Sequence, residues 1–381
     1  MNPSDFHILV VEDNSLIRKM IVHILKKHGY QVDDASDGKL ALSKIQKDKP
    51  DLVILDIIMP EMDGLELLEK VRQTQSQVEL PIILVTAMQG SEDIVKGFEL
   101  GANDYLPKNF NSAELFARVN TALAIKNYHN LLKIRNNTIE RELDIARLIQ
   151  KKLLPHSAPQ IPGYKIASLY VPMDKVGGDY YDFHSMNEYC DFFMADVSGH
   201  GVPGAFLASV IKMVTQYTSH LNFDPTEILR VMDQAVSERG ALAMFATAVI
   251  LRLYPNSGKI SFSNAGHIPI LVHKRLSDEF IELTVPGAPL GINFDFKKKG
   301  FVLGHHILDP GDRLILYTDG IGETTNSENI PFDEKRWKEF LIENKNTETE
   351  KLTTILRNEL QIYGGKTTFE DDLSMVVLDR E

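Results

Sequence analysis

The sequence predicts a multidomain protein in which a helical linker joins an α/β domain to an α+β domain. Within residues 1–124, five short apolar runs alternate with five amphipathic stretches. This alternation predicts a doubly wound five-stranded parallel sheet with helices on both faces. Residues 125–154 carry a helical pattern alone. Within residues 155–381, strand-like runs follow one another without intervening helices, which is typical of antiparallel sheets.

The strands of the first domain are expected where Val, Ile and Leu form near-continuous runs, because a parallel sheet is buried on both faces. The strong runs are His7–Val11, Leu52–Leu55, Pro81–Val85 and Asp104–Leu106, and a weaker candidate is Gln31–Ala35. The amphipathic stretches that predict helices are Ser15–His28, Lys39–Gln46, Leu65–Arg72, Glu92–Glu99 and Ser112–Ala124.

The linker carries an apolar residue at every seventh position. The members of this stripe are Ile125, Leu132, Ile139, Ala146 and Leu153. A seven-residue stripe favours a coiled coil, and thus a homodimer, although charged Arg135 and Glu142 fall in the companion stripe. The alternative is a single helix packed on its own C-terminal domain. Pro155 and the Pro162-Gly163 pair end the helix and mark a domain boundary.

The third domain is expected to combine strands with two blocks of helix. The strand-like runs are Lys165–Val171, Asp191–Val197, Thr247–Leu253, Lys259–Ser263, Ile268–His273, Arg313–Tyr317 and Ser374–Leu378. The helical stretches are Pro203–Leu221, Pro225–Arg239, Glu334–Glu343 and Glu350–Tyr363.

Composition excludes several classes of protein. The net charge of −12 argues against sequence-independent binding to nucleic acid or to anionic membranes. The single cysteine, Cys190, excludes a disulfide framework and a cysteine-based zinc site. The polar start of the chain predicts no signal peptide, and no apolar run has the length of a membrane helix. We therefore expect a cytoplasmic protein.

Polar residues gather at the predicted strand ends of the first domain. Glu12 and Asp13 follow the first strand, Asp56 the third, Thr86 the fourth and Lys108 the fifth. These ends meet at one edge of a parallel sheet, and three converging carboxylates suit a hard cation such as Mg²⁺. Asp56 could then accept a phosphoryl group, with Lys108 supplying positive charge and Thr86 a hydroxyl. Any one of these acids alone would more often be a helix cap.

The segment from Leu55 to Gly64, LDIIMPEMDG, closely resembles the receiver domain of two-component response regulators. The resemblance covers residues ~5–125 and implies that a sensor histidine kinase phosphorylates Asp56. Glu12, Asp13, Thr86 and Lys108 match the family's acid pair, switch threonine and lysine, and Tyr105 matches its switch aromatic. One departure is Asn109, which stands where the family usually has proline, so the loop that carries Lys108 could differ.

Acidic residues also mark the third domain. Asp179 follows two glycines, Asp196 lies near the end of an apolar strand, Asp319 precedes Gly320, and Asp371-Asp372 leads into the last strand. An Asp-Gly pair alone is more often a turn. Together, carboxylates at strand ends favour hard, oxygen-liking metals over zinc, and two such ions can activate water for attack on phosphorus.

These motifs occur in an order that closely resembles the PPM (PP2C) superfamily of metal-dependent protein phosphatases, in its SpoIIE and RsbU branch. The matching segments are Val176–Asp182, Asp196–Gly201, Asn264–His267, Pro286–Gly291, Thr318–Gly320 and Asp371-Asp372, preceded by the lead-in helix Glu142–Gln150 with Leu153–Pro155. The resemblance spans ~140–381 and implies a PP2C-like β-sandwich flanked by helices.

By position, the resemblance implies two Mn²⁺ or Mg²⁺ ions. Asp196 would bridge both ions, and the Val197 carbonyl would join the second. Asp319 and Asp371 would complete the first, and Asp179 would sit beside the second through water. His200 could be a general acid or only a helix-start residue, and His267 is expected to be structural.

The leading hypothesis is a Ser/Thr protein phosphatase controlled by phosphorylation of Asp56. The resemblance implies a substrate, the phosphorylated form of an anti-sigma factor antagonist of the STAS type. It does not give the sign of the control. A second hypothesis is a phosphorylation-gated adaptor with a non-catalytic phosphatase-like domain, and a third is a DNA-binding regulator. Retention of all four aspartates opposes the adaptor, and no basic recognition helix supports DNA binding.

Overall fold

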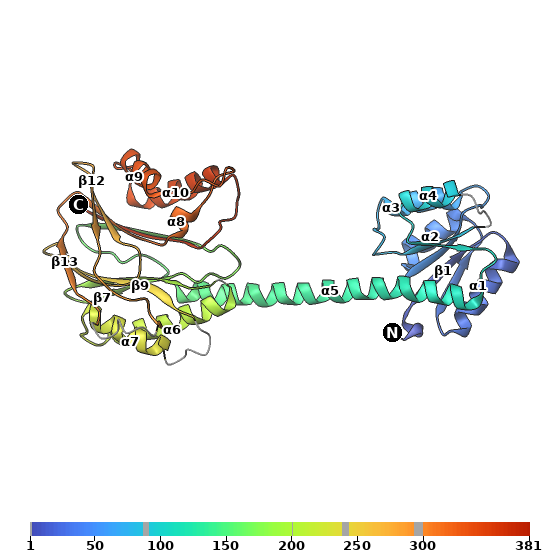
Figure 1. Cartoon of the computed structure of the whole chain (residues 1–381), viewed down its shortest axis with the longest axis horizontal. Helices are drawn as coiled ribbons and strands as arrows, with labels where there is room; N and C mark the ends of the chain where they lie inside the picture. The colour runs from blue at the N-terminus through green and yellow to red at the C-terminus, as the bar shows by residue number, and fades with distance from the viewer. Residues whose placement is uncertain (1, 87–90, 200, 238–243, 293–299) are drawn as a thin grey trace. The chain divides into compact units, whose positions relative to one another are not determined.

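The computed structural model describes residues 2–86, 91–199, 201–237, 244–292 and 300–381, with the backbone alone at 91–93. Its internal contacts divide the chain into two compact units, Met1–Ile139 and Glu140–Glu381 (Figure 1). Within the described residues, no helix has both the length and the apolar character that a membrane span requires.

The first unit is a five-stranded parallel sheet in the order β2-β1-β3-β4-β5. Its strands are β1 (His7–Val11), β2 (Gln31–Ala35), β3 (Leu52–Asp56), β4 (Ile82–Thr86) and β5 (Asp104–Pro107). Its helices are α1 (Ser15–Lys27), α2 (Gly38–Asp48), α3 (Gly64–Arg72), α4 (Ser91–Glu99) and the start of α5 (Ser112–Leu153), after a 3-10 turn, η1 (Pro3–Asp5). Two apolar cores, one on each face of the sheet, confirm the predicted doubly wound architecture.

Gly64 fixes the loop that follows the third strand. Its backbone N–H donates to the carbonyl of Ile57 at 2.8 Å. A Cβ at position 64 would collide with the backbone oxygen of Asp56. The Asp-Gly pair that begins α3 therefore lets the chain return close beneath Asp56.

Helix α5 includes both the last predicted helix of the first domain and the predicted linker, because it runs without interruption from Ser112 to Leu153. Its N-terminal turns bury Leu115, Val119 and Leu123 in the core of the first unit. Nothing between Ala124 and Ile125 breaks helical geometry, so the helix continues until Pro155. Leu132 and Ile139 are 61% and 45% exposed.

The second unit contains two five-stranded antiparallel sheets, in the orders β13-β10-β9-β8-β7 and β12-β11-β14-β15-β6. The strands of the first sheet are β7 (Tyr180–Ser185), β8 (Cys190–Val197), β9 (Ala246–Tyr254), β10 (Lys259–Ala265) and β13 (Gly304–Ile307). Those of the second are β6 (Tyr164–Val171), β11 (Ile270–Lys274), β12 (Glu279–Leu283), β14 (Asp312–Tyr317) and β15 (Leu373–Arg380).

Helices cover the outer faces of this sandwich. Helices α6 (Val202–Ser219) and α7 (Pro225–Ser237) pack on the first sheet, and α8 (Gly320–Glu323), α9 (Glu334–Glu343) and α10 (Thr349–Gly364) on the second (Figure 1). A core that contains Phe192 of one sheet and Val376 of the other fills the space between them. The predicted α+β sandwich flanked by helices is confirmed.

Three strands escaped prediction, β7, β12 and β13, and each lies at an edge of its sheet. An edge strand packs on fewer neighbours, so its apolar pattern is weaker. Strand β13, for example, alternates between half-buried and exposed residues and has no fully buried position. The four-residue helix α8 was also missed.

Candidate functional site

The first unit brings its predicted acidic residues together at the carboxyl edge of the sheet. Glu12 and Asp13 directly follow β1, and Asp56 is the last residue of β3. One carboxylate oxygen from each of these three residues lies within 4.8 Å of the other two. Glu12 and Asp56 are each only 1% exposed, while Asp13 is exposed to solvent.

Lys108 links two of these carboxylates. Its Nζ donates to Asp56 Oδ2 at 2.7 Å and to Glu12 Oε1 at 3.0 Å. Burial by itself lowers the pKa of Lys108, but these two hydrogen bonds outweigh it and raise the pKa. Burial also raises the pKa of Glu12, and the charge of Asp56 adds to that effect. One lysine therefore offsets only part of the negative charge.

The same cluster has the properties of a divalent cation site. Glu12 Oε2 is buried and accepts no hydrogen bond from the described part of the chain. Three carboxylates with one unsatisfied buried oxygen are the donors that Mg²⁺ prefers. Glu12, Asp13 and Asp56 are thus the residues that would hold the ion.

The remaining predicted residues of this site lie on the neighbouring strands. Thr86 ends β4 and is 4% exposed. Its carbonyl accepts from the backbone N–H of Lys108 at 2.8 Å. Lys108 therefore reaches Asp56 although Asn109, not proline, follows it. The ring of Tyr105 lies edge-on to Phe98 and beneath the guanidinium of Arg118.

The acidic residues of the second unit come from both sheets of the sandwich. Asp179 precedes β7, and Asp196 is near the end of β8. Asp319 follows β14, and Asp371 precedes β15. Thr318 joins the two sheets, because its Oγ1 donates to Asp179 Oδ2 at 2.8 Å.

Mutual repulsion shapes the electrostatics of this second cluster. Burial, followed by the charges of Asp319 and Asp371, raises the pKa of Asp196 to about 7. Burial and the charge of Asp196 also raise the pKa of Asp179 well above its ordinary value. The negative charges of this cluster therefore repel one another, and its oxygen donors match two hard cations.

This cluster is wider than the one in the first unit. Within the described ranges, three side-chain ligand atoms lie within 4.8 Å of one another only at Glu12, Asp13 and Asp56. A wider spacing fits two ions that share Asp196, because each ion then draws on only part of the set.

The structure separates the roles of the two adjacent aspartates before β15. The carboxylate of Asp372 is 4% exposed and accepts from the backbone N–H groups of Met173 (2.7 Å), Gly178 and Asp179 (3.2 Å). Asp372 thus holds the loop that carries Asp179. Asp371 is half-buried, and its charge raises the pKa of Asp196. This arrangement supports Asp371 as the ligand.

His267 is the histidine of these motifs that the structure describes. His267 bonds through its ring nitrogens to Thr247 Oγ1 at 2.7 Å and to the carbonyl of Tyr317 at 3.0 Å. Burial lowers the pKa of His267 to about 4, so the ring is neutral at pH 7. Its two hydrogen bonds tie β14 to the first sheet. His200 lies outside the described residues.

Sequence reasoning gave no role to Gln150, Thr318, Glu323 or Asp372. Glu323 adds to the charges that raise the pKa of Asp196. Gln150, Thr318 and Asp372 lie inside recognised motifs, but the distant groups to which they bond carry no local sequence signal. A cavity of about 330 Å³ adjoins Asp319, and its lining combines apolar side chains such as Phe332 and Trp337 with the acidic Glu323 and Glu334. Such a cavity can accept the side chain of a bound segment.

Comparison with known proteins matches two segments of the chain to two families. Residues 8–120 match the response regulator receiver domain. Residues 187–381, about half of the chain, match Stage II sporulation protein E (SpoIIE). The chain belongs to the SpoIIE family.

Relatives of this SpoIIE-family chain each match part of its length. The phosphoserine phosphatase RsbU of Bacillus subtilis is 28% identical over 255 residues, which are 66% of this chain and 74% of that protein. The response regulator MprA of Mycolicibacterium vanbaalenii is 43% identical over 116 residues, which are 30% of this chain and 49% of that protein. The chain thus spans about half the length of such regulators.

A solved structure supports the fold of the SpoIIE-family unit. The SiaA-PP2C domain of Pseudomonas aeruginosa superposes with a TM-score of 0.57 and 25% identity, covering 65% of this chain and 99% of that domain. The first unit is therefore a receiver domain, and the second is a metal-dependent protein-serine/threonine phosphatase domain of the PP2C type.

The pKa of Asp196 gives a prediction for stability. Its folded-state pKa of about 7 exceeds the ordinary 3.8, so the folded chain holds this proton more tightly than the unfolded chain. Stability is therefore lost as the pH rises through this window. Without divalent ions, we expect the free energy of unfolding of the phosphatase unit to fall by on the order of 2 kcal/mol between pH 5 and 7.

Urea unfolding at several pH values measures this fall. Asp319→Asn removes one neighbouring charge and should make the fall smaller, and Mn²⁺ should abolish it. A rise in stability over the same window, or a fall that Asp319→Asn leaves unchanged, contradicts the assignment.

Proposed function

We propose that phosphorylation of Asp56 controls a Ser/Thr protein phosphatase whose substrate is a phosphorylated anti-sigma factor antagonist of the STAS type. The observation that carries the proposal is the coexistence of two complete sites on one chain. The Nζ of Lys108 donates to the Asp56 carboxylate at 2.7 Å. Burial, and next the charges of Asp319 and Asp371, raise the pKa of Asp196. A phosphorylation-gated adaptor would need the first arrangement but has no need of the second.

The phosphoacceptor step uses groups that are already in place. An oxygen of Asp56 attacks the phosphorus of a phosphohistidine on a sensor kinase, forming an O–P bond as the N–P bond breaks. Lys108 neutralises charge on the phosphoryl oxygens, and the Thr86 hydroxyl is available to turn toward them. Positioning and neutralisation are most of what phosphoryl transfer requires.

At the phosphatase site, five groups would hold two ions. Asp196 would serve both, with the Val197 carbonyl and, through water, Asp179 beside the second ion, and with Asp319 and Asp371 on the first. When bound, such ions supply Lewis acidity that lowers the pKa of attacking water. The cavity beside Asp319 would take substrate residues that flank the phosphoserine.

The regulatory signal would pass through α5, since that helix begins in the first unit and ends in the second. Turning a two-state equilibrium from mostly off to mostly on needs about 5.5 kcal/mol, more than one side-chain rotation supplies. Exposed apolar side chains of the seven-residue stripe, Ile125, Leu132 and Ile139, would be covered by α5 of a second copy. A coiled-coil homodimer could supply this energy.

Loss of a metal ligand tests the enzymatic half. Asp319→Ala in the full chain should reduce phosphate release from a phosphoserine peptide in Mn²⁺ by at least about 100-fold, since outer contacts alone are worth 10–100-fold. The exposed Glu328→Gln is a matched control and should retain wild-type rates. Wild-type protein that releases no phosphate from any phosphoprotein would instead favour the adaptor.

Charges placed in the linker stripe test the coupling half. Leu132→Asp with Ile139→Asp should convert a dimer into a monomer in light scattering and remove any response to acetyl phosphate, because carboxylates oppose each other in a helix seam. Asn137→Asp adds one such charge at a polar position and should preserve both. Regulation that survives the double substitution would rule out this route.

A further inference from the structure

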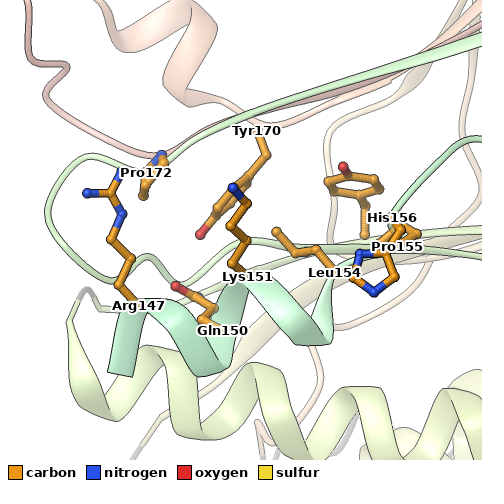
Figure 2. A pocket seen from close by; sticks show the side chains of 9 residues that line it. Arg147, Gln150, Lys151, Leu154, Pro155, His156, Tyr170 and Pro172 are labelled. Carbon is orange, nitrogen blue, oxygen red and sulfur yellow. The ribbon is translucent and has the colours of Figure 1, made fainter. Parts of the chain in front are cut away.

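The end of α5 lies against the loop that leads to Asp179. Figure 2 shows this junction, a cavity of about 370 Å³ whose lining includes Arg147, Gln150, Lys151 and Tyr170. Gln150 is 5% exposed, while Arg147 and Lys151 are exposed to solvent. Gln150 is therefore the polar residue that this helix buries at the junction.

Gln150 satisfies both polar groups of a single backbone residue. Its Nε2 donates to the carbonyl of Gly177 at 2.6 Å, and the N–H of Gly177 donates to its Oε1 at 3.1 Å. A Cβ on Gly177 would collide with Asp372 Oδ2 and Tyr170 Oη. Only glycine therefore lets the amide, the loop and Asp372 pack together.

The chain continues from this contact directly into the metal cluster. The N–H groups of Gly178 and Asp179 both donate to Asp372 Oδ2. Gly178 also packs closely against the Val197 carbonyl: a Cβ added to Gly178 would lie 3.0 Å from that oxygen. Asp179 and Val197 are both proposed ligands of the second ion. Displacement of Gly177 would therefore move that half of the cluster.

We propose that Gln150 is a positioning residue that makes the metal affinity of the phosphatase site depend on the seating of α5. If α5 moved along the loop by one residue position, its side chains would move by 1.5 Å along the helix axis and about 100° around it. Such a movement would break both hydrogen bonds between Gln150 and Gly177. Buried amide groups cannot remain unpaired without a cost, so the loop of Gly177 must rearrange with the helix. The inference rests on the proposed function, because it requires ions beside Asp179.

Calorimetric Mn²⁺ titration of the full chain tests this role. Glu12→Gln and Asp13→Asn are included throughout to remove binding by the receiver. Gln150→Leu keeps the size and helix propensity of the side chain but removes both bonds, and should weaken Mn²⁺ binding about 10–100-fold. Gln150→Glu keeps the acceptor for Gly177 N–H and should fall between. Lys151→Leu alters the next, exposed position and should bind as the parent does.

Thermal unfolding without Mn²⁺ separates positioning from mere anchoring. If Gln150→Leu lowers the unfolding midpoint but its folded form binds Mn²⁺ like the parent, Gln150 only anchors the helix and the inference is overturned. If Gln150→Leu does not fold, the same comparison with Gln150→Glu decides. A parent chain that binds no Mn²⁺ at this site would refute the proposed function itself, a result distinct from equal binding by parent and variant.

Discussion

Repulsion between neighbouring carboxylates is the constraint on which both functional centres depend. The receiver gathers Glu12, Asp13 and Asp56 within 4.8 Å, and Lys108 offsets part of their negative charge. The phosphatase unit gathers acids from two sheets, and the pKa of Asp196 rises to about 7 because burial and its neighbours disfavour the ionised form. Such clusters lower the free energy of unfolding unless cations bind. We infer that both units retain them because the carboxylates are needed to bind metal ions and to react with phosphate.

Much of the fold follows from the sequence, because the central strands are buried on both faces. Strands β1, β3, β4, β8 and β9 coincide with apolar runs. The missed strands β7, β12 and β13 are edges, where one side of the ladder has no partner and polar residues are tolerated. The join between the first domain and the linker was placed inside what is a continuous helix, α5, since a domain boundary need not interrupt helical geometry.

The candidate sites divide in the same way. Acids at strand ends were visible as a pattern, because parallel or paired strands bring their ends to one place. The hydrogen bonds that hold those acids were not visible in the sequence. Asp372 accepts from backbone groups some 190 residues away in sequence, and Gln150 donates to the carbonyl of Gly177, 27 residues away. Contacts of this kind depend on the fold as a whole, and no local pattern encodes them.

The central claim is that a phosphoryl group on Asp56 changes catalysis at Asp196. The most direct measurement is phosphate release from a phosphoserine peptide by the full chain, with and without acetyl phosphate, compared with Asp56→Asn. The account predicts that acetyl phosphate changes the rate of phosphate release by the wild-type protein. It also predicts that Asp56→Asn releases phosphate at the rate of the unphosphorylated wild-type protein, with or without acetyl phosphate. Equal rates for wild-type protein with and without acetyl phosphate, when Asp56 is shown to be phosphorylated, would contradict it.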